Sequence, residues 1–557
     1  MKKVLAAILL SLSVAVLPAW ARDRSEEMLT IMRLMPADSP LAVVVADVQE
    51  LDGTVASLCK RLKIEDPPPP LIESIKEELG IAALVDFSKP MGAAGRPPVV
   101  WAHVPDATAK IKGLPGAKQE NEIWQFSNNG SEELFAKISG EIVIVATGKD
   151  LLVKATAKEN RSLAEEVKPR VEMLKDRIAF AHFNVELFRE EALAGIGQLA
   201  PMAPMGAMML SQQAGMTDPT GMIGALMTVI DAARKLTEQI AYVELSLGLD
   251  SEAGRVTFAT GYKDGAIKDY LLKQKPGSVP PFSEIEEQPF MVAAAYHQPG
   301  NESPFIDYLF EQMKKGMSGG GTAPPSEPAK TPLAETLQIL KDLYSKTEGS
   351  NVVFSMSPEG MKVVGDYFGP DPAALLELVK KSMTLANPLG GKLYESAGTR
   401  KIGDVEVESY ALKLPETPGN TAMPGKLPLV GEARPHLGVR GGRVRVCMGS
   451  EKDVEQVFRG KVEKPLSSAP AVREAFAKLP AQRNGVLLFD LSSLMKLVEA
   501  TLGKSPGSAA AASPPVVLSF SVAGHPARLD AYVPIKAVEQ LVAALSAQPV
   551  EPLGNKP

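Results

Sequence analysis

The side chains able to do acid–base or metal chemistry are few and widely spaced in this chain. Its 557 residues include five histidines and two cysteines. No two histidines are close enough in sequence to form a metal pair on one helix or hairpin, and neither H-E-x-x-H nor C-x-x-C occurs. Carboxylates are plentiful, but their spacing selects no pair as general acid and base. The sequence therefore selects no catalytic, cofactor-binding or metal-ligating residue, and we expect His182, inside a strand-like run, to be a hydrogen-bonded sheet histidine.

Three matches to nucleophile motifs are present. Gly316–Gly320 fits G-x-S-x-G, but a hydrolase elbow needs a strand before the serine and a helix after it, and this match lies in a Gly/Pro-rich stretch. Ser57–Lys60 and Ser493–Lys496 fit S-x-x-K without an accompanying K-T-G. Both fall on amphipathic helical patterns, where we expect Ser and Lys to occupy the solvated side.

A methionine-rich segment spans residues 199–227. Thioethers bind Cu(I), so a copper site is chemically admissible. Methionine also forms deformable apolar surfaces, and such a surface could contact a partner, a lipid or another domain. The segment contains neither histidine nor cysteine, which favours the apolar surface. Its methionines are Met202, Met205, Met208, Met209, Met216, Met222 and Met227.

The first 21 residues predict export. Lys2 and Lys3 precede an apolar run from Val4 to Pro18, and Ala19-Trp20-Ala21 supplies small residues at the positions that a signal peptidase recognises. The run is short for an anchor, because a membrane-spanning helix needs roughly 20 apolar residues. We expect cleavage after Ala21, release into the periplasm or the medium, and a mature chain without a transmembrane segment.

Composition is that of a folded protein, with 45% apolar and 23% charged residues. The formal charge of −6 becomes about −8 when the two lysines of the signal are removed. No basic stripe is visible, which argues against nucleic-acid binding and against adhesion to anionic lipid through a polybasic segment. Cys59 and Cys447 could pair after export, or could be buried free thiols.

Changes in composition predict the domain boundaries. The clearest is a Gly/Pro-rich stretch at 314–332, which cannot continue a helix or a central strand. The predicted division is a signal peptide at 1–21, a first α+β domain at 22–313 with the methionine-rich insertion at 199–227, the linker at 314–332, a second α+β domain at 333–547 with a loop at 414–435 and a linker at 503–515, and a disordered tail at 548–557.

Two local patterns recur along the chain. Apolar strands end at Asp47, Asn184 and Asp490, each followed by a helical pattern whose first-turn amides the side chain can cap. Strands that leave a polar turn and run into a helix lie at 140–148, 254–261 and 442–449. We predict the α+β class, with repeated strand-helix-hairpin modules that form curved antiparallel sheets carrying helices on one face. Alternation of Arg443 and Arg445 with valines predicts that the other face is wet.

The segment Leu34–Val48 resembles the start of a group of uncharacterised bacterial exported proteins, which open with a Pro-Ala-Asp-Ser/Thr phrase, an apolar strand, and Asp or Asn before a helix. The resemblance implies an exported α+β protein and supplies no catalytic residues. Our functional hypothesis is a non-catalytic binding or structural protein of the cell envelope, partnered by an unidentified protein or envelope component. The alternative is a hydrolase of envelope polymers or peptides with a site assembled from sequence-distant residues.

Overall fold

The computed structural model describes residues 23–62, 64, 67–128, 132–213, 220–249, 252–275, 282–297, 332–357, 360–384, 394–412, 434–493, 514–522, 524 and 526–546. The predicted signal peptide and the tail at 548–557 lie outside these residues, as does the linker at 314–332 except for its last residue, Pro332. So do nearly all of the predicted loop at 414–435 and linker at 503–515.

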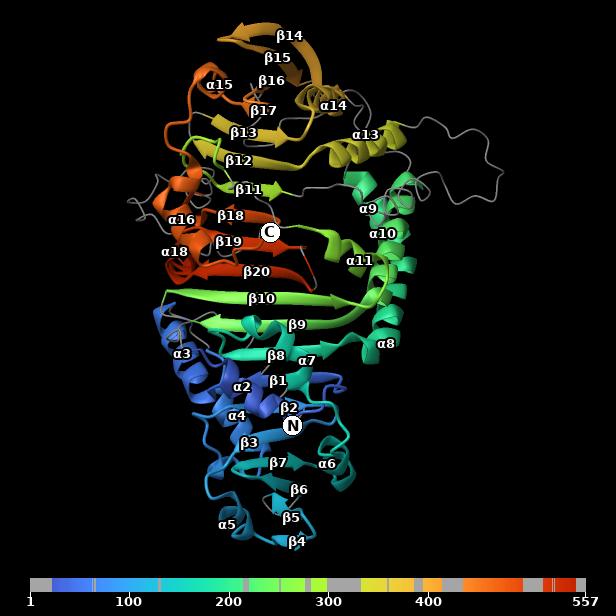
Figure 1. Cartoon of the computed structure of the whole chain (residues 1–557), viewed down its shortest axis with the longest axis vertical. Coiled ribbons are helices and arrows are strands. Elements are labelled where there is room, and N and C mark those ends of the chain that lie inside the picture. Colours follow the sequence, from blue (N-terminus) through green and yellow to red (C-terminus); the bar gives the residue numbers. More distant parts are fainter. Residues whose placement is uncertain are drawn as a thin grey trace, which may run out of the picture. The chain divides into compact units, whose positions relative to one another are not determined.

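Helices and antiparallel strands build an α+β protein, as the sequence predicted (Figure 1). The helices are α2 (Ser25–Met32), α3 (Val48–Arg61), α4 (Leu71–Glu78), α5 (Ala107–Lys112), α6 (Lys149–Ala155), α7 (Leu163–Val167), α8 (Val185–Gly197), α9 (Ala203–Gln213), α10 (Thr220–Gln239), α11 (Ala266–Lys273), α13 (Pro332–Lys346), α14 (Pro372–Thr384), α15 (Glu451–Arg459), α16 (Pro470–Ala477) and α18 (Ile535–Ser546). Within the described part of the chain, no helix is long and apolar enough to span a membrane.

The strands are β1 (Leu41–Val45), β2 (Met91–Ala94), β3 (Val99–His103), β4 (Lys118–Glu120), β5 (Ile123–Asn128), β6 (Glu132–Ser139), β7 (Ile142–Ala146), β8 (Ala179–Asn184), β9 (Ile240–Leu249), β10 (Ala253–Tyr262), β11 (Val292–His297), β12 (Gly349–Ser357), β13 (Gly360–Phe368), β14 (Tyr394–Ile402), β15 (Val405–Leu412), β16 (Pro435–Arg440), β17 (Arg443–Met448), β18 (Gly485–Phe489), β19 (Val516–Ser521) and β20 (Ala527–Pro534).

The chain divides into two compact units. Unit 1 comprises residues 1–188, 241–261 and 528–557, and unit 2 comprises residues 189–240 and 262–527. This grouping differs from the predicted division at 314–332, which lies outside the described residues and stays a prediction. The difference arises because strand pairing brings sequence-distant segments into one sheet.

Unit 1 contains a sheet in the order β20-β10-β9-β8-β1-β2-β3-β7-β6-β5-β4 (Figure 1). The pairings from β9 to β4 are antiparallel. Strand β1 lies between β2 and β8, so every backbone group along it has a neighbouring strand to bond.

Both faces of the unit 1 sheet are covered at β1. Leu41, Val43 and Val45 belong to an apolar core with residues of α3 and α4. The alternate residues of the same strand, Ala42 and Val44, belong to a second core with residues of α2 and α7. Successive side chains of a strand point to opposite faces, so helices pack on both. The prediction of helices on one face is therefore wrong for this sheet.

The predicted strand-to-helix transitions are confirmed as caps and turns. Asp47 accepts a hydrogen bond from the amide of Glu50 at 2.7 Å and begins α3. Asn184 accepts from the amide of Glu186 at 3.1 Å, and Asp490 accepts from the amide of Ser492 at 3.0 Å. Each bond satisfies an amide that has no partner inside the helix.

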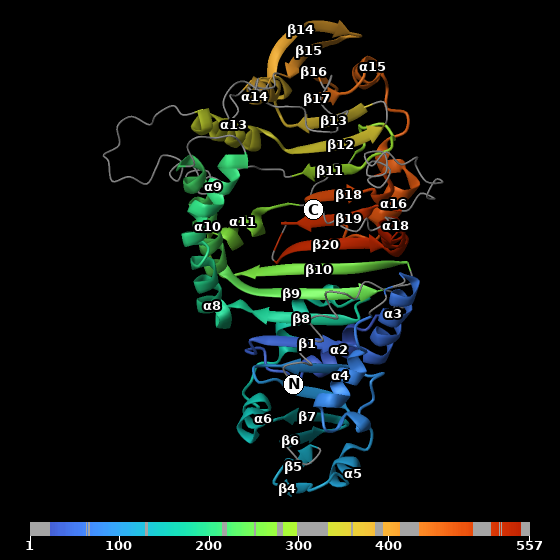
Figure 2. The same cartoon turned by 180° about the vertical axis from the view of Figure 1, so that it is seen from behind.

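In unit 2, antiparallel strands pair in the order β19-β18-β11-β12-β13-β17-β16-β15-β14 (Figure 2). Val444 and Val446 of β17 pack with α14, whereas Cys447 of the same strand packs with α15 on the opposite face. Because α15 covers that face, Arg445 is buried. The predicted wet face is wrong at this strand.

A buried polar chain fastens the C-terminal strand to unit 1. Arg177 donates from Nη2 to Thr257 Oγ1 at 3.1 Å, and Thr257 donates from Oγ1 to Asp530 Oδ1 at 2.6 Å. Burial lowers the pKa of Arg177 to about 10, while the charge of Asp530 acts to raise it. The next helix contributes Ile535 to the core around β1. Residues from three distant parts of the sequence thus complete one core.

We predict that Asp530→Asn destabilises unit 1 by about 3 kcal/mol, because it removes the carboxylate that offsets the buried charge of Arg177. Trp101 and Trp124 lie in unit 1 and are the only tryptophans beyond the predicted signal peptide. Their fluorescence during urea unfolding measures the change. Glu26→Gln, which breaks the exposed pair with Arg33, is the matched control and should alter the transition little. Equal transitions for the two variants would contradict the prediction.

Candidate functional site

The described histidines lie on four different strands and do not converge. His103 Nε2 lies 3.0 Å from Glu141 Oε2, and His436 Nδ1 lies 2.9 Å from Ser409 Oγ. Burial lowers the pKa of both His297 and His436. His525 lies outside the described residues. Among the residues that the structure describes, no group of three or more His, Cys, Asp or Glu side chains is arranged to hold a metal ion.

The two cysteines are buried free thiols, one of the two outcomes that the sequence left open. Burial raises the pKa of Cys59 and raises that of Cys447 to about 12. The thiolate is the nucleophilic form of cysteine, so neither residue is set up for covalent chemistry at neutral pH.

The nucleophile motifs gain no catalytic surroundings. Ser57 and Lys60 are exposed on α3, as the amphipathic pattern predicted. The Gly316–Gly320 match and Lys496 of the second S-x-x-K match lie outside the described residues.

A buried charged cluster around Glu244 in unit 1 was not predicted from the sequence. Glu244 is fully buried on β9 and accepts from Arg170 Nε at 2.9 Å. His182, on the neighbouring strand β8, donates from Nδ1 to the same carboxylate at 3.2 Å. The ring of Tyr242 lies under the Arg170 guanidinium, 4.4 Å from ring centroid to Cζ, and stacks on the His182 ring at 5.5 Å. Four polar side chains from three segments therefore form one network.

The electrostatics of this network indicate a role in stabilising the fold. Burial alone would raise the pKa of Glu244, but hydrogen bonds from His182 and Arg170 outweigh it and lower that pKa. The carboxylate is thus held ionised with its oxygens engaged, which suits fixing β9 to β8 rather than moving a proton. Tyr242, Glu244 and Ser246 alternate along the strand, but Arg170 comes from a distant turn, so no local signal identifies the cluster.

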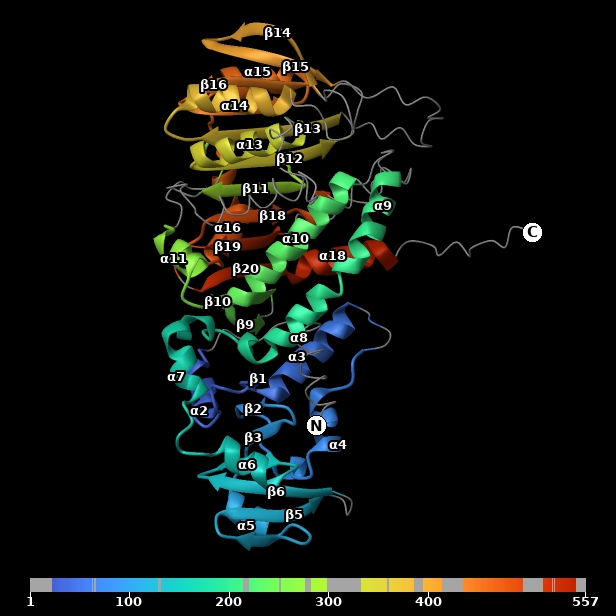
Figure 3. The same cartoon turned by 90° about the vertical axis from the view of Figure 1, so that its right-hand side faces the viewer.

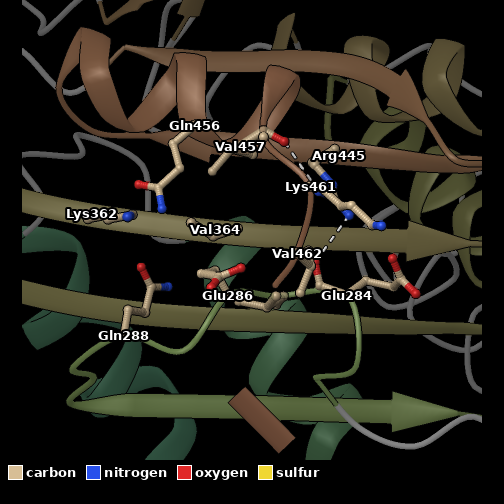
Figure 4. A pocket seen from close by; sticks show the side chains of 12 residues that line it. Glu284, Glu286, Gln288, Lys362, Val364, Arg445, Gln456, Val457, Lys461 and Val462 are labelled. Atoms are coloured by element: carbon tan, nitrogen blue, oxygen red, sulfur yellow. Dashed lines mark hydrogen bonds between the residues drawn. The ribbon is translucent and has the colours of Figure 1, made fainter. Parts of the chain in front are cut away.

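The cavity shown in Figure 4 gathers acidic and basic side chains in unit 2. Its volume is about 30 Å³, which is room for a water or two. The Glu286 carboxylate accepts from the amides of Glu463 at 2.9 Å and Lys464 at 3.1 Å. These bonds hold the chain after α15 in place, so the Glu286 carboxylate has a structural role.

Arg445 lines the same cavity, and its guanidinium is likewise engaged in hydrogen bonds within the fold. It donates from Nε to Asp366 Oδ1 at 2.8 Å. It also donates from Nη2 to the carbonyl of Glu284 at 3.2 Å (Figure 4). Burial raises the pKa of Asp366, and the guanidinium of Arg445 acts against that shift. The acidic and basic side chains around this cavity, which could resemble a hydrolase site, therefore form a buried ion pair and the hydrogen bonds that hold a loop.

A larger hollow of about 230 Å³ lies in unit 1 beside α2 and β6. Three cations line it: Arg33, Lys137 and Lys158. Arg33 pairs with Glu26 at 3.2 Å and Lys137 pairs with Glu122 at 2.9 Å, so surface carboxylates offset most of the positive charge. The hollow is smaller than the roughly 300–1,000 Å³ of ordinary small-molecule sites.

The methionine-rich segment carries an exposed apolar surface. Its described part forms a 3₁₀ turn (Ala200–Met202), α9 and α10, and α9 packs against α10 (Figure 3). Five methionines of unit 2 are between 41% and 60% exposed. We call them the methionine surface: Met202, Met205, Met208, Met209 and Met227. Met216 lies outside the described residues, and the copper interpretation stays a prediction.

The comparisons with known proteins assign no family. No protein-family model matches the chain, and no curated protein matches it. Among solved structures, crystal forms III, IV and I of TP0453 are similar at 10%, 11% and 9% identity. They cover 49%, 48% and 42% of this chain and 99%, 98% and 80% of their own, with TM-scores of 0.23, 0.23 and 0.22. Scores this low carry no argument about fold or function.

We predict that Glu244→Gln lowers the free energy of unfolding by about 3–5 kcal/mol at pH 6, because Arg170 is left buried without its counter-charge. The folded-state pKa of Glu244 is lowered from its ordinary value of 4.5, so its contribution is complete above pH 4.5 and is lost as the pH falls through the folded-state pKa. Tryptophan fluorescence in urea at pH 6 and pH 3 should therefore show a smaller difference from wild type at pH 3.

Glu141→Gln is the control for this prediction, because it breaks an exposed glutamate–histidine pair in the same unit. It should change the unfolding transition little at either pH. A Glu244→Gln effect of the same size at pH 6 and pH 3 would show that the charge of Glu244 does not stabilise the fold.

Proposed function

We propose that the chain is an exported, non-catalytic protein of the cell envelope that binds a partner through the methionine surface. We also propose that the strands of its two units are copies of one repeated module. The observation that carries the binding proposal is the exposure of five methionines on adjoining helices. A surface helix ordinarily turns charged and polar residues to water and apolar residues to the core. Here the side of α9 that faces water carries the methionines.

The energetic gain from covering this surface is substantial. Full burial of a methionine side chain contributes roughly 1.5–3 kcal/mol. These side chains are about half exposed, so each has about 1 kcal/mol still to gain, and the five together have about 5 kcal/mol. A gain of that size supports reversible association with a partner.

Matching strand orders support the repeated module. The order β9-β8-β1-β2-β3-β7-β6-β5-β4 in unit 1 corresponds strand by strand to β19-β18-β11-β12-β13-β17-β16-β15-β14 in unit 2. The recurring sequence pattern at 140–148 and 442–449 falls on corresponding strands, β7 and β17. Each of these strands is followed by a helix.

The proposed repeat also indicates that the fold does not require the methionine-rich segment. Strands β8 and β9 are joined by 55 residues (185–239), whereas the corresponding β18 and β19 are joined by 26 residues (490–515). The same strand arrangement is therefore reached with a connection about half as long. The additional length of the first connection, which contains α9 and α10, is available for binding.

Export predicts a defined N-terminus. When the full chain is produced with its own leader in a bacterial host, N-terminal sequencing of the periplasmic or secreted product should begin at Arg22. Replacing Ala21 with arginine should block cleavage, because signal peptidases require a small residue at that position. Recovery of wild-type chain that retains Met1 would contradict the export proposal.

Binding predicts that the methionine surface becomes shielded in the envelope. Cys59 and Cys447 are buried, so Met209→Cys can be labelled selectively with a solvent-sensitive fluorophore on the folded protein. Adding envelope fractions should reduce quenching of the label by iodide at least twofold. Leu272→Cys on α11, which is as exposed and lies in the same unit, is the matched control and should remain fully quenched. Equal quenching at both positions would contradict binding through the methionine surface.

A further inference from the structure

The methionine surface lies in an unusually uncharged stretch. From Ala192 to Ile230 the sequence has one charged residue, Asp218, and no histidine or aromatic residue. Charges return at Asp231 and continue along the second half of α10, where Lys235 pairs with Asp231 at 3.0 Å. One end of this helical pair is therefore apolar, and the other is suited to water.

The spacing of the methionines places them on one side of α9. Met202, Met205 and Met209 follow intervals of three and four residues, which align along a helix face, and Met208 adjoins them. The other side of α9 meets α10: Ala203 is buried, and a Cβ built on Gly206 would lie 4.0 Å from Leu226 Cδ1. The methionines thus point away from the contact that holds the helices together.

The chemistry of the surroundings distinguishes between possible partners. Methionine is enriched at protein interfaces, but the residues that dominate the binding energy there are mostly Trp, Tyr and Arg. The stretch from Ala192 to Ile230 offers none of these three residue types. Hydrocarbon requires neither charge nor hydrogen bonds, and flexible methionine side chains adapt to a fluid surface. The absence of charge on this surface is complementary to lipid.

Resting on the proposed function, we infer that the partner of the methionine surface is the acyl region at the surface of a lipid membrane. The helices lie in the interface and do not cross it, because the second half of α10 carries Asp231, Arg234, Lys235 and Glu238. The stretch from Ala192 to Ile230 contains no Lys or Arg to attract anionic headgroups, so binding depends on apolar burial alone.

Flotation with phosphatidylcholine vesicles tests this inference on the full exported chain. We expect reversible binding with a partition constant on the order of 10⁴ M⁻¹, comparable to a single myristoyl chain. Adding about a third phosphatidylglycerol, or raising the salt tenfold, should leave binding unchanged, whereas a basic surface would respond to both. A label at Met209→Cys should be quenched by brominated acyl chains, and a label at Leu272→Cys should not.

Charge substitutions identify the surface responsible. Met205→Glu with Met209→Glu should weaken vesicle binding at least about tenfold, whereas Met205→Leu with Met209→Leu should preserve it. Leu272→Glu is the matched exposed control and should bind like wild type. Equal binding by the glutamate double variant and the wild type would overturn the inference, and the leucine variant separates this effect from a general loss of folding.

The outcome also distinguishes the two proposals. If pure vesicles fail to bind while envelope fractions shield Met209→Cys, the lipid inference falls and a protein or polymer partner remains. If neither binds, the proposed function falls with it. Binding that requires phosphatidylglycerol would replace the inferred apolar mechanism with an electrostatic one.

Discussion

Helices cover both faces of the central strands, and this double burial governs where charged side chains can lie. In unit 1, alternate residues of β1 enter two separate apolar cores, one with α3 and α4 and the other with α2 and α7. In unit 2, alternate residues of β17 divide in the same way between α14 and α15. These central strands thus form an inner layer, where side chains are mostly apolar and the buried charges lie next to opposite charges.

The charged residues on these strands stabilise the fold because each is buried next to a residue of opposite charge. Glu244 is enclosed with Arg170 and His182, and Asp366 is enclosed with Arg445, because water cannot reach either face to solvate them. Removing one member of such a pair costs far more than breaking an exposed pair. Groups that would resemble catalytic residues in a list of sequence positions are therefore engaged in holding strands and loops.

The methionine surface departs from this arrangement. In the cores of both units apolar side chains pack between helices and strands, whereas Met205 and Met209 on α9 are turned toward solvent. The shorter connection between β18 and β19 joins the same kind of strands without a segment of this length. This segment is therefore where we place the proposed binding function.

Local residue types were sufficient to predict several parts of the fold. The apolar run before Asp47 identified β1, and the side chain of Asp47 identified the start of α3, because strand formation and N-capping depend on neighbouring residues. The exposed Ser57 and Lys60 were likewise predicted from helical periodicity. The methionine-rich segment was visible from composition alone. The unbroken apolar run at β1 also carried an unused signal, since strands buried on both faces lack polar alternation.

Which distant segments share a core could not be predicted from the sequence. Asp530 joins Thr257 across 273 residues and, through it, Arg177, and strand pairing across such separations leaves no local pattern. The sequence also misplaced Arg445 on a wet face, because it predicted a helix directly after this strand but not the face of the sheet on which that helix, α15, packs. Residue types along the chain therefore predicted these strands and helices, their caps and the uncharged methionine segment. Tertiary packing decided burial and charge pairing, because both depend on neighbours that the chain brings from far away.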